Sequence, residues 1–144
     1  MLDLDKRAIS YAKNKNRKYL NAMTFHNANV IRFTPDKKFD LIFIDGDHSY
    51  EGVLNDTIKT FSLRRDNNSI IVWHDYGFST EMVRYSVLNA ILDGIPVKDH
   101  CNLYHVSNTL CPVYIGNKNF NTYYCKFPST PDKIFSITLK STKL

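Results

Sequence analysis

The sequence predicts an α/β fold, in which helices flank one mostly parallel sheet and antiparallel strands lie near the C-terminus. Two short apolar runs, at residues 39–45 and 69–73, are each followed by a polar segment and then by helical spacing of apolar residues. Such alternation of strand and helix is typical of parallel strands joined by crossover helices. The length of 144 residues predicts a single domain over residues 1–144.

The two apolar runs predict buried strands. The first, FDLIFID at residues 39–45, is nearly continuous in its apolar character, and the second, SIIVW at residues 69–73, resembles it. Runs without polar alternation are typical of strands that are covered on both faces. Between them, apolar residues at helical spacing predict a helix over about residues 51–63.

Two more helices are predicted. Residues 6–20 have amphipathic spacing, and Asp5 directly before them is a suitable N-cap. Residues 80–92 form the other helix, with Gly94 and Pro96 as the signals that end it.

The remaining strands are short. Residues 22–26 predict a strand, followed by a loop over residues 27–34 that has room for one helical turn. Nearer the C-terminus, residues 103–106 and 113–115 predict a β-pair, and residues 134–139 alternate as a last strand. Antiparallel edge strands are common on sheets of this kind.

The composition is that of a globular protein, with 43% hydrophobic and 23% charged residues. Much of the net charge of +5 falls in one early segment with six basic side chains: Lys6, Arg7, Lys13, Lys15, Arg17 and Lys18. We favour the solvated face of a helix over a nucleic-acid patch, because no aromatic-rich binding motif accompanies this charge. Nucleic acid is therefore a less favoured partner than a small molecule.

The cysteines predict a reducing compartment. Cys101, Cys111 and Cys125 are odd in number and show no CxxC spacing, so we expect buried free thiols. The N-terminal residues are charged where a signal peptide is apolar, and no run approaches the roughly 20 apolar residues of a membrane span. We therefore expect a cytoplasmic protein with no membrane partner.

Acidic and histidine residues follow both buried runs. Asp45, Asp47 and His48 follow the first run, and His74 and Asp75 follow the second. Ligands of open parallel sheets bind beyond the carboxyl ends of the strands, so these side chains should converge. They could hold a divalent cation, or a histidine could act as a general base. They could also only cap the following helices, an interpretation that suits Asp47.

The strings FDLIFIDGDHSYEGVLND and SIIVWHDYG resemble the fourth and fifth strands of class I S-adenosylmethionine-dependent methyltransferases. The similarity is greatest to the small-molecule O-methyltransferase-like branch. LDLDKRAISYAK resembles the end of the second strand and its helix, TFHNANVIRF the third strand, and LYHVSNTLCPVYIG the late strands. Over residues 2–116 the resemblance implies a Rossmann-like fold and transfer of a methyl group to a small hydroxylated substrate.

The resemblance also implies roles for single residues. Asp3 would bind the cofactor ribose, and Asn29 stands where the family usually has an acid that meets the adenine amine. Asp45 would lie beside the methionine part of S-adenosylmethionine. His48 and His74 would be candidates for the general base or for substrate contact, next to Asp45 in the catalytic site.

In the metal-dependent branch of the family, the acids that match Asp45 and Asp75 bind magnesium. That branch usually has Asn after the second acid, whereas this chain has Tyr76. A magnesium site formed by Asp45 and Asp75 is therefore an expectation that departs from the family pattern at one position.

The family binds its cofactor over a glycine-rich loop after the first strand, where only glycine lets the backbone approach closely. No G-x-G pattern occurs in the 144 residues, so we expect a domain that is incomplete at its N-terminus. The missing first strand would leave unpaired edges in the sheet. We expect one of three repairs: closure of residues 22–26 onto residues 39–45, a homodimer, or a partner chain.

Two functions other than methyl transfer stay open. An inactive methyltransferase-like module could act by oligomerisation or partner binding, which the missing glycine-rich loop favours. A metal-dependent hydrolase that uses the same acids and histidines is less favoured, because helical phosphohydrolases with an HD pair lack this strand context.

Overall fold

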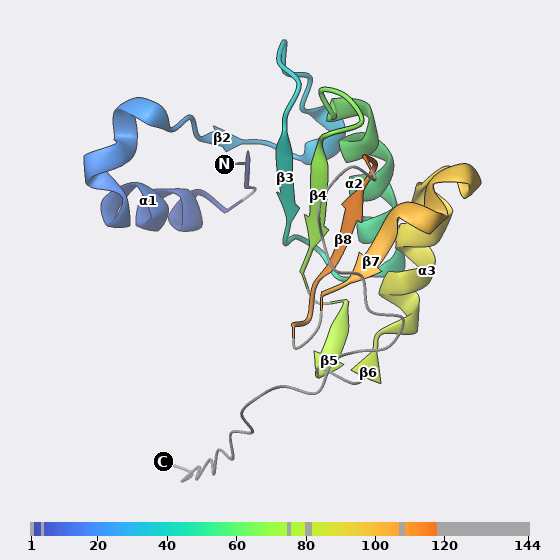
Figure 1. Cartoon of the computed structure of the whole chain (residues 1–144). Coiled ribbons are helices and arrows are strands. Elements are labelled where there is room, and N and C mark those ends of the chain that lie inside the picture. The colour runs from blue at the N-terminus through green and yellow to red at the C-terminus, as the bar shows by residue number, and fades with distance from the viewer. Residues whose placement is uncertain (1, 4, 75, 80–81, 107–108, 118–144) are drawn as a thin grey trace, which may run out of the picture.

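The computed structural model describes residues 2–3, 5–74, 76–79, 82–106 and 109–117. Its centre is a four-stranded sheet in the order β3-β4-β8-β7 (Figure 1). The strands are β3 (Leu41–Ile44), β4 (Ile70–Trp73), β8 (Pro112–Ile115) and β7 (Leu103–His105). The pair β3–β4 is parallel, and β4–β8 and β7–β8 are antiparallel. The predicted α/β fold and the late β-pair are thus confirmed.

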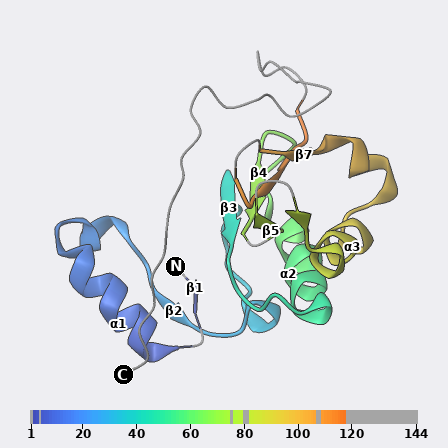
Figure 2. The same cartoon turned by 90° about the horizontal axis from the view of Figure 1, so that it is seen from below.

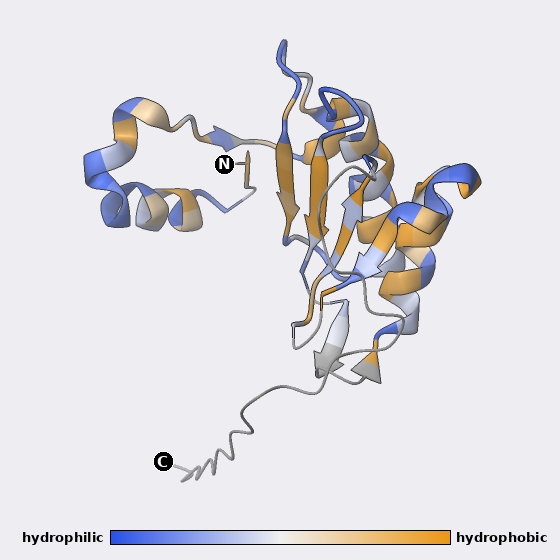
Figure 3. Cartoon of the chain, in the orientation of Figure 1, coloured by the Kyte–Doolittle hydropathy of each residue, from blue (hydrophilic) through white to orange (hydrophobic). Residues whose placement is uncertain are grey.

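Helices α2 (Tyr50–Leu63) and α3 (Tyr85–Gly94) lie together on one face of this sheet (Figures 1 and 2). The strands β3 and β4 are strongly hydrophobic in Figure 3. The buried cluster between sheet and helices consists of Val53, Ile71, Trp73, Val87, Ala90, Ile91, Ile95 and Tyr114. The Trp73 indole Nε1 donates a hydrogen bond of 3.0 Å to Thr57 Oγ1, so the largest core side chain has a polar partner as well.

The last residue of α3, Gly94, sets the distance between the two helices. A Cβ atom at this position would lie 2.7 Å from Thr57 Cγ2 and 2.8 Å from Thr57 Cβ, both too close for carbon atoms. We expect Gly94→Ala to lower the free energy of unfolding by about 1–3 kcal/mol, since overpacking forces the helices apart. Urea unfolding of the variant and the parent chain measures this change in the free energy of unfolding. The matched control Ser86→Ala, at an exposed position of α3, should change little, and an unchanged stability of Gly94→Ala would contradict the close contact.

The N-terminal elements form a separate unit. β1 (Leu2–Asp3) and β2 (His26–Asn27) make a two-stranded parallel sheet of their own. Between them, α1 (Lys6–Lys15) and the 3₁₀ helix η1 (Arg17–Ala22) project away from the four-stranded sheet (Figures 1 and 2). A second 3₁₀ turn, η2 (Val30–Arg32), follows β2.

Three details of this unit confirm predictions. The Asp5 side chain caps α1, because its Oδ1 accepts a hydrogen bond of 2.7 Å from the backbone N–H of Arg7. The six basic side chains between residues 6 and 18 are exposed, as expected of a solvated helix face. The predicted turn in the loop over residues 27–34 is η2.

The expected closure of residues 22–26 onto residues 39–45 is wrong. The chain is 3₁₀-helical up to Ala22, and the strand residues are His26–Asn27, which pair with β1 and not with β3. The N-cap hydrogen bond of η2 turns the chain away directly after β2, since Asn29 Oδ1 accepts from the Ile31 amide at 2.8 Å.

The first apolar run, which forms β3, is less buried than predicted. Leu41 and Phe43 are 63% and 57% exposed. The reason is positional: β3 lies at the edge of the sheet, and α2 and α3 cover one face only. The second run is buried as predicted, with Ile71 and Trp73 at 0% and 1% exposure.

The helix predicted over residues 80–92 begins later, at Tyr85. The preceding residues form the antiparallel pair β5 (Gly77–Ser79) and β6 (Met82–Val83). A backbone hydrogen bond of 2.8 Å from Arg84 N to Tyr76 O also joins the two strands. The residues of β6 therefore pair with β5 and do not begin the helix.

The expectation of buried thiols is wrong for Cys101, which is exposed, whereas Cys111 is half-buried. Cys125 and the strand predicted at residues 134–139 lie outside the described residues. None of the helices in the described part of the chain has the length and apolar character that a membrane span needs.

Candidate functional site

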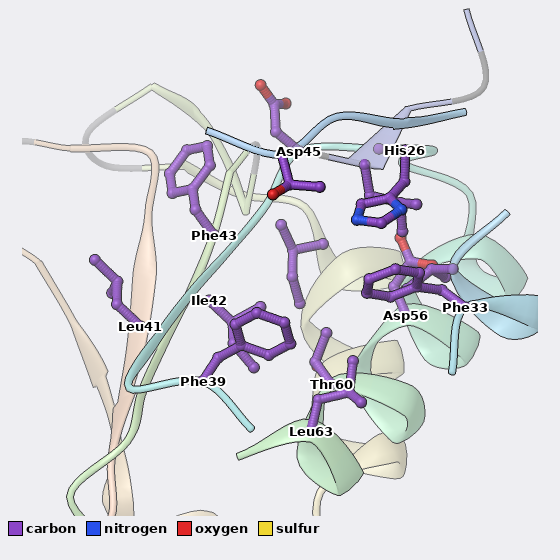
Figure 4. A pocket seen from close by; sticks show the side chains of 15 residues that line it. His26, Phe33, Phe39, Leu41, Ile42, Phe43, Asp45, Asp56, Thr60 and Leu63 are labelled. Carbon is purple, nitrogen blue, oxygen red and sulfur yellow. The ribbon is translucent and has the colours of Figure 1, made fainter. Parts of the chain in front are cut away.

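Two adjoining cavities lie where β3 ends. The first, of about 480 Å³, separates the β1–β2 unit from β3 and is mostly apolar (Figure 4). The second, of about 550 Å³, lies between η2 and the start of α2 and is lined by four acidic side chains: Asp45, Asp47, Glu51 and Asp56. Both cavities are lined by Leu2, Val30, Asp45, Gly46 and Asp56, so they form one continuous site.

Strand register brings Asp45 and His74 together. Ile44 of β3 pairs with Trp73 of β4, so the next residue of each parallel strand lies beside the other. Asp45 Oδ1 lies 3.3 Å from His74 Nδ1, with the two side chains 52% and 38% exposed. His74 lines neither cavity, but its partner Asp45 lines both. The predicted convergence of the two strand ends is thus confirmed for this pair.

Asp47 does not cap α2 as we considered, because Ser49 is the N-cap, but its carboxylate supports that cap. Its Oδ1 accepts from Ser49 N at 2.9 Å and its Oδ2 from Ser49 Oγ at 2.8 Å, while Ser49 Oγ caps α2 by accepting from Gly52 N at 3.1 Å. The hydrogen bond from the Ser49 amide is the main cause that lowers the pKa of Asp47. A Cβ atom on Gly52 would lie 2.8 Å from Asp47 Cγ, so glycine is required for this turn.

The structure gives less information on three other predicted site residues, Asn29, His48 and Asp3. Asn29 is exposed and lines the acidic cavity, where its Oδ1 accepts from the Ile31 amide. His48 is half-buried and lines neither cavity. Asp3 belongs to β1, but its side chain lies outside the described part of the structure.

Asp75 also lies outside the described residues, so the magnesium pair with Asp45 stays a prediction. Within the described ranges, no three side chains of His, Cys, Asp or Glu are grouped so that they could hold a metal ion. Of the two aromatic residues near the site, Trp73 packs in the core, whereas Tyr50 is exposed and its hydroxyl donates to Asp93 Oδ2 at 2.7 Å.

Asp56 on α2 is a site residue that the sequence analysis missed. It lines both cavities, and its Oδ2 would lie 3.1 Å from a Cβ atom on Gly46. Burial is the main cause that raises the pKa of Asp56, and the negative charge of Asp47 adds to it. Helical spacing places Asp56 on the same face of α2 as Gly52 and the buried Thr60, but it does not show that this face borders the cavities.

The raised pKa of Asp56 predicts a pH-dependent effect on stability. The folded protein binds this proton more tightly than the unfolded chain, so the stabilisation is full below the unfolded pKa of about 4 and is lost as the pH rises through the folded pKa. We therefore expect Asp56→Asn to be more stable than the parent chain at pH 7 and to lose that advantage at acid pH. Urea unfolding at both pH values measures this.

The matched control for that experiment is Asp36→Asn, which changes an exposed carboxylate in a loop. It should alter stability little at either pH, since its carboxylate is solvated in both states. An Asp56→Asn variant that is destabilised equally at both pH values would contradict a burial cost and would indicate a lost hydrogen bond instead.

Comparison with known proteins identifies the family. The profile of a methyltransferase domain matches residues 2–76, which is more than half of the chain. The chain belongs to this methyltransferase family. The match ends at Tyr76, two residues after His74, and so contains Asp45, the acidic cavity and the two parallel strands.

Solved structures with the same fold support this assignment. The N-methyltransferase NodS from Bradyrhizobium japonicum WM9, in complex with S-adenosyl-L-homocysteine, aligns with a TM-score of 0.53 at 11% identity, over 78% of this chain and 62% of NodS. A proposed methyltransferase from Thermoplasma acidophilum aligns with a TM-score of 0.53 at 9% identity, over 82% of this chain and 56% of that protein. No protein of curated function matches this chain significantly. The chain thus spans about three fifths of the length of these relatives in fold.

Proposed function

We propose that this methyltransferase chain transfers a methyl group from S-adenosylmethionine to a small hydroxylated substrate, with Asp45 at the centre of the site. The observation that carries the proposal is the position of Asp45, which lines both cavities and lies 3.3 Å from the imidazole of His74. Membership of the methyltransferase family supports the reaction class. The cofactor is supported by NodS, a protein of the same fold that was solved with S-adenosyl-L-homocysteine.

The residues around the acidic cavity fit such a cofactor. A volume of about 550 Å³ lies within the usual range of roughly 300–1,000 Å³ for small-molecule sites. Its carboxylates suit ribose hydroxyls and an amino group, while Leu2, Val30 and Ile31 offer apolar contact to a base. Gly46 and Gly52 make room for the carboxylates of Asp56 and Asp47, which a Cβ atom at either glycine would meet at 3.1 Å or 2.8 Å.

The reaction needs a base for the hydroxyl proton. When bound, S-adenosylmethionine supplies a methyl group on a positively charged sulfonium. The Asp45 carboxylate lies 3.3 Å from His74 Nδ1, close enough to favour one orientation of the imidazole, and Nε2 is then the nitrogen that we propose takes the proton from the attacking hydroxyl. The site also accelerates the transfer by holding the sulfonium methyl group and the attacking hydroxyl in line.

Among the two predicted bases, we propose His74 over His48. Neither histidine lines a cavity itself, and the observation that favours His74 is its position 3.3 Å from Asp45, the carboxylate that lines both cavities. Asp3 and Asn29 are proposed to bind the cofactor, because β1 and the turn after β2 border the acidic cavity through Leu2 and Asn29.

The proposal is tested by transfer of a labelled methyl group from S-adenosylmethionine to a panel of small catechols and sugars, with magnesium or with a chelator. Label in at least one acceptor, lost in Asp45→Asn, is the expected result. A requirement for magnesium would support Asp45 and Asp75 as its ligands. No transfer to any acceptor would instead favour an inactive module that binds a partner, a function that the open edge of β3 also suits.

A further inference from the structure

The positive charge of the chain is concentrated in its N-terminal unit. Residues 6–35 contain seven Lys or Arg side chains and no Asp or Glu, whereas the other residues together contain more acidic than basic side chains. Six of the seven belong to α1 and η1, which project away from the four-stranded sheet (Figures 1 and 2). We call α1 and η1 the basic arm.

The charges of the basic arm are available to a partner. All six Lys and Arg side chains are exposed. Among the described residues, the arm takes part in one ion pair, in which Arg7 Nη2 lies 3.3 Å from Asp5 Oδ2. This pair is itself exposed and therefore weak. Like charges on one short segment repel one another, and a bound polyanion relieves that repulsion.

Aromatic rings accompany the lysines of the basic arm. Lys15 Nζ lies 5.5 Å from the ring centroid of Tyr11, and Lys18 Nζ lies 4.7 Å from that of Tyr19. The two tyrosines are 65% and 53% exposed. On sequence grounds nucleic acid was the less favoured partner, because no aromatic-rich motif accompanies the charge, but the fold places a lysine beside each of these rings. Proteins that bind single strands combine cations for the phosphates with rings for the bases in this way.

Helical spacing alternates charge and ring along one face of α1. Arg7, Tyr11 and Lys15 follow one another at intervals of four residues, so they lie one above another on the same face. Successive turns of the helix are about 5.4 Å apart. A strand laid along this face meets a cation, a ring and a second cation in turn.

We propose that the basic arm binds single-stranded nucleic acid, with phosphates on its Lys and Arg side chains and unpaired bases stacked on Tyr11 and Tyr19. Bases that are paired in a duplex cannot stack on side chains, so the exposed tyrosines favour a single strand. The inference does not depend on methyl transfer, since no residue of the basic arm lines either cavity.

An anionic membrane surface suits the basic arm less well. Helices that lie in a membrane interface bury a face of Trp, Phe or Leu side chains. The sequence of α1 contains none of these three residue types, and its Ile9 is only 7% exposed. In η1, Leu20 is 39% exposed and stands among polar and basic neighbours. The exposed side chains of the arm therefore offer charge and tyrosine rings, and no continuous apolar face.

Fluorescence anisotropy of a labelled thymidine oligomer of about 20 nucleotides, titrated with the full chain, tests the proposal. We expect a dissociation constant of about 1–100 μM near physiological salt, the range of binding without sequence preference. From about 50 mM to about 200 mM NaCl, the slope of log K against log salt should be about −2 to −3.5, for roughly three to five phosphate contacts. The duplex with an adenosine oligomer should bind at least about fivefold more weakly, since its bases cannot stack on the tyrosines.

Variants of the tyrosines separate stacking from charge. Tyr11→Ala and Tyr19→Ala should each weaken binding of the single strand by at least about fivefold and leave the salt slope unchanged, because each removes a ring and no charge. Tyr11→Phe retains a ring and should bind within about twofold of the parent chain. The matched control is Tyr85→Ala, which removes a tyrosine that is 75% exposed outside the arm and should leave binding unchanged.

Variants of the lysines locate the phosphate contacts. Lys15→Gln combined with Lys18→Gln should reduce the salt slope by about 1.4, since each contact contributes about 0.7 on a single strand. The same pair of changes at Lys37 and Lys98, which are exposed outside the arm, should leave the slope unchanged.

Circular dichroism should be the same for all of these variants, because the substituted side chains are exposed. Four results would each overturn the proposal: no binding at low salt, equal binding of the duplex, full binding by both Tyr→Ala variants, or a slope that the Lys15 and Lys18 changes do not alter. Phosphatidylserine vesicles that bind the chain and displace the oligomer would overturn it as well and would indicate a membrane partner.

Discussion

We expect His74→Asn to lower kcat for methyl transfer by about 10²–10⁴-fold, the usual contribution of a positioned general base. The asparagine retains a polar group near Asp45 Oδ1 but cannot take a proton from the substrate hydroxyl. Affinity for S-adenosyl-L-homocysteine should stay within about threefold, because His74 does not line the cavity assigned to the cofactor. The measurement is steady-state transfer of labelled methyl to an acceptor found in the panel.

His48→Asn is the matched control, since it makes the same change three residues after Asp45. Since we assign the base to His74, which lies 3.3 Å from Asp45, kcat should change by less than about threefold in His48→Asn. The reverse pattern, with His48 essential and His74 dispensable, would contradict the assignment of the base while leaving methyl transfer intact. Equal small effects would show that positioning alone drives the reaction.

The largest effect on stability is expected from Trp73→Ala, with a loss of about 3–5 kcal/mol in the free energy of unfolding. Trp73 is 1% exposed, packs in the cluster between sheet and helices, and donates to Thr57 Oγ1 at 3.0 Å. The substitution leaves both a cavity and a buried hydroxyl without its donor. Urea unfolding followed by circular dichroism measures the change.

Ile58→Ala on the outer face of α2 is the control for that variant. Ile58 is 54% exposed, so its truncation should change the free energy of unfolding by no more than about 0.5 kcal/mol. A loss below about 1.5 kcal/mol for Trp73→Ala would contradict the central place of the indole in the core.

Local signals made most of the fold predictable. The strand ending at Trp73, the Asp5 cap and the pairing of β7 with β8 each depend on short-range pattern, and each is confirmed. The convergence of Asp45 and His74 was also predictable, because parallel strands end at the same edge.

The predictions that were wrong or incomplete have a common physical cause: each depended on contacts between elements that are distant in the sequence. Nothing local distinguishes an edge strand from a central one, so the apolar run of β3 predicted burial that Leu41 and Phe43 do not have. The hairpin before α3 depends on pairing between β5 and β6, which overrides helical spacing. Asp56 was missed because its importance depends on burial between η2 and α2, which a helical pattern alone does not reveal.

The most direct test of the central claim is a calorimetric titration of the 144-residue chain with S-adenosyl-L-homocysteine. We expect a dissociation constant of about 1–100 μM, equivalent to roughly −5.5 to −8 kcal/mol, and a clear weakening in Asp45→Asn. That result would place the cofactor at the end of β3, beside Asp45. No binding at millimolar ligand, or equal binding by Asp45→Asn, would contradict the proposed cofactor site.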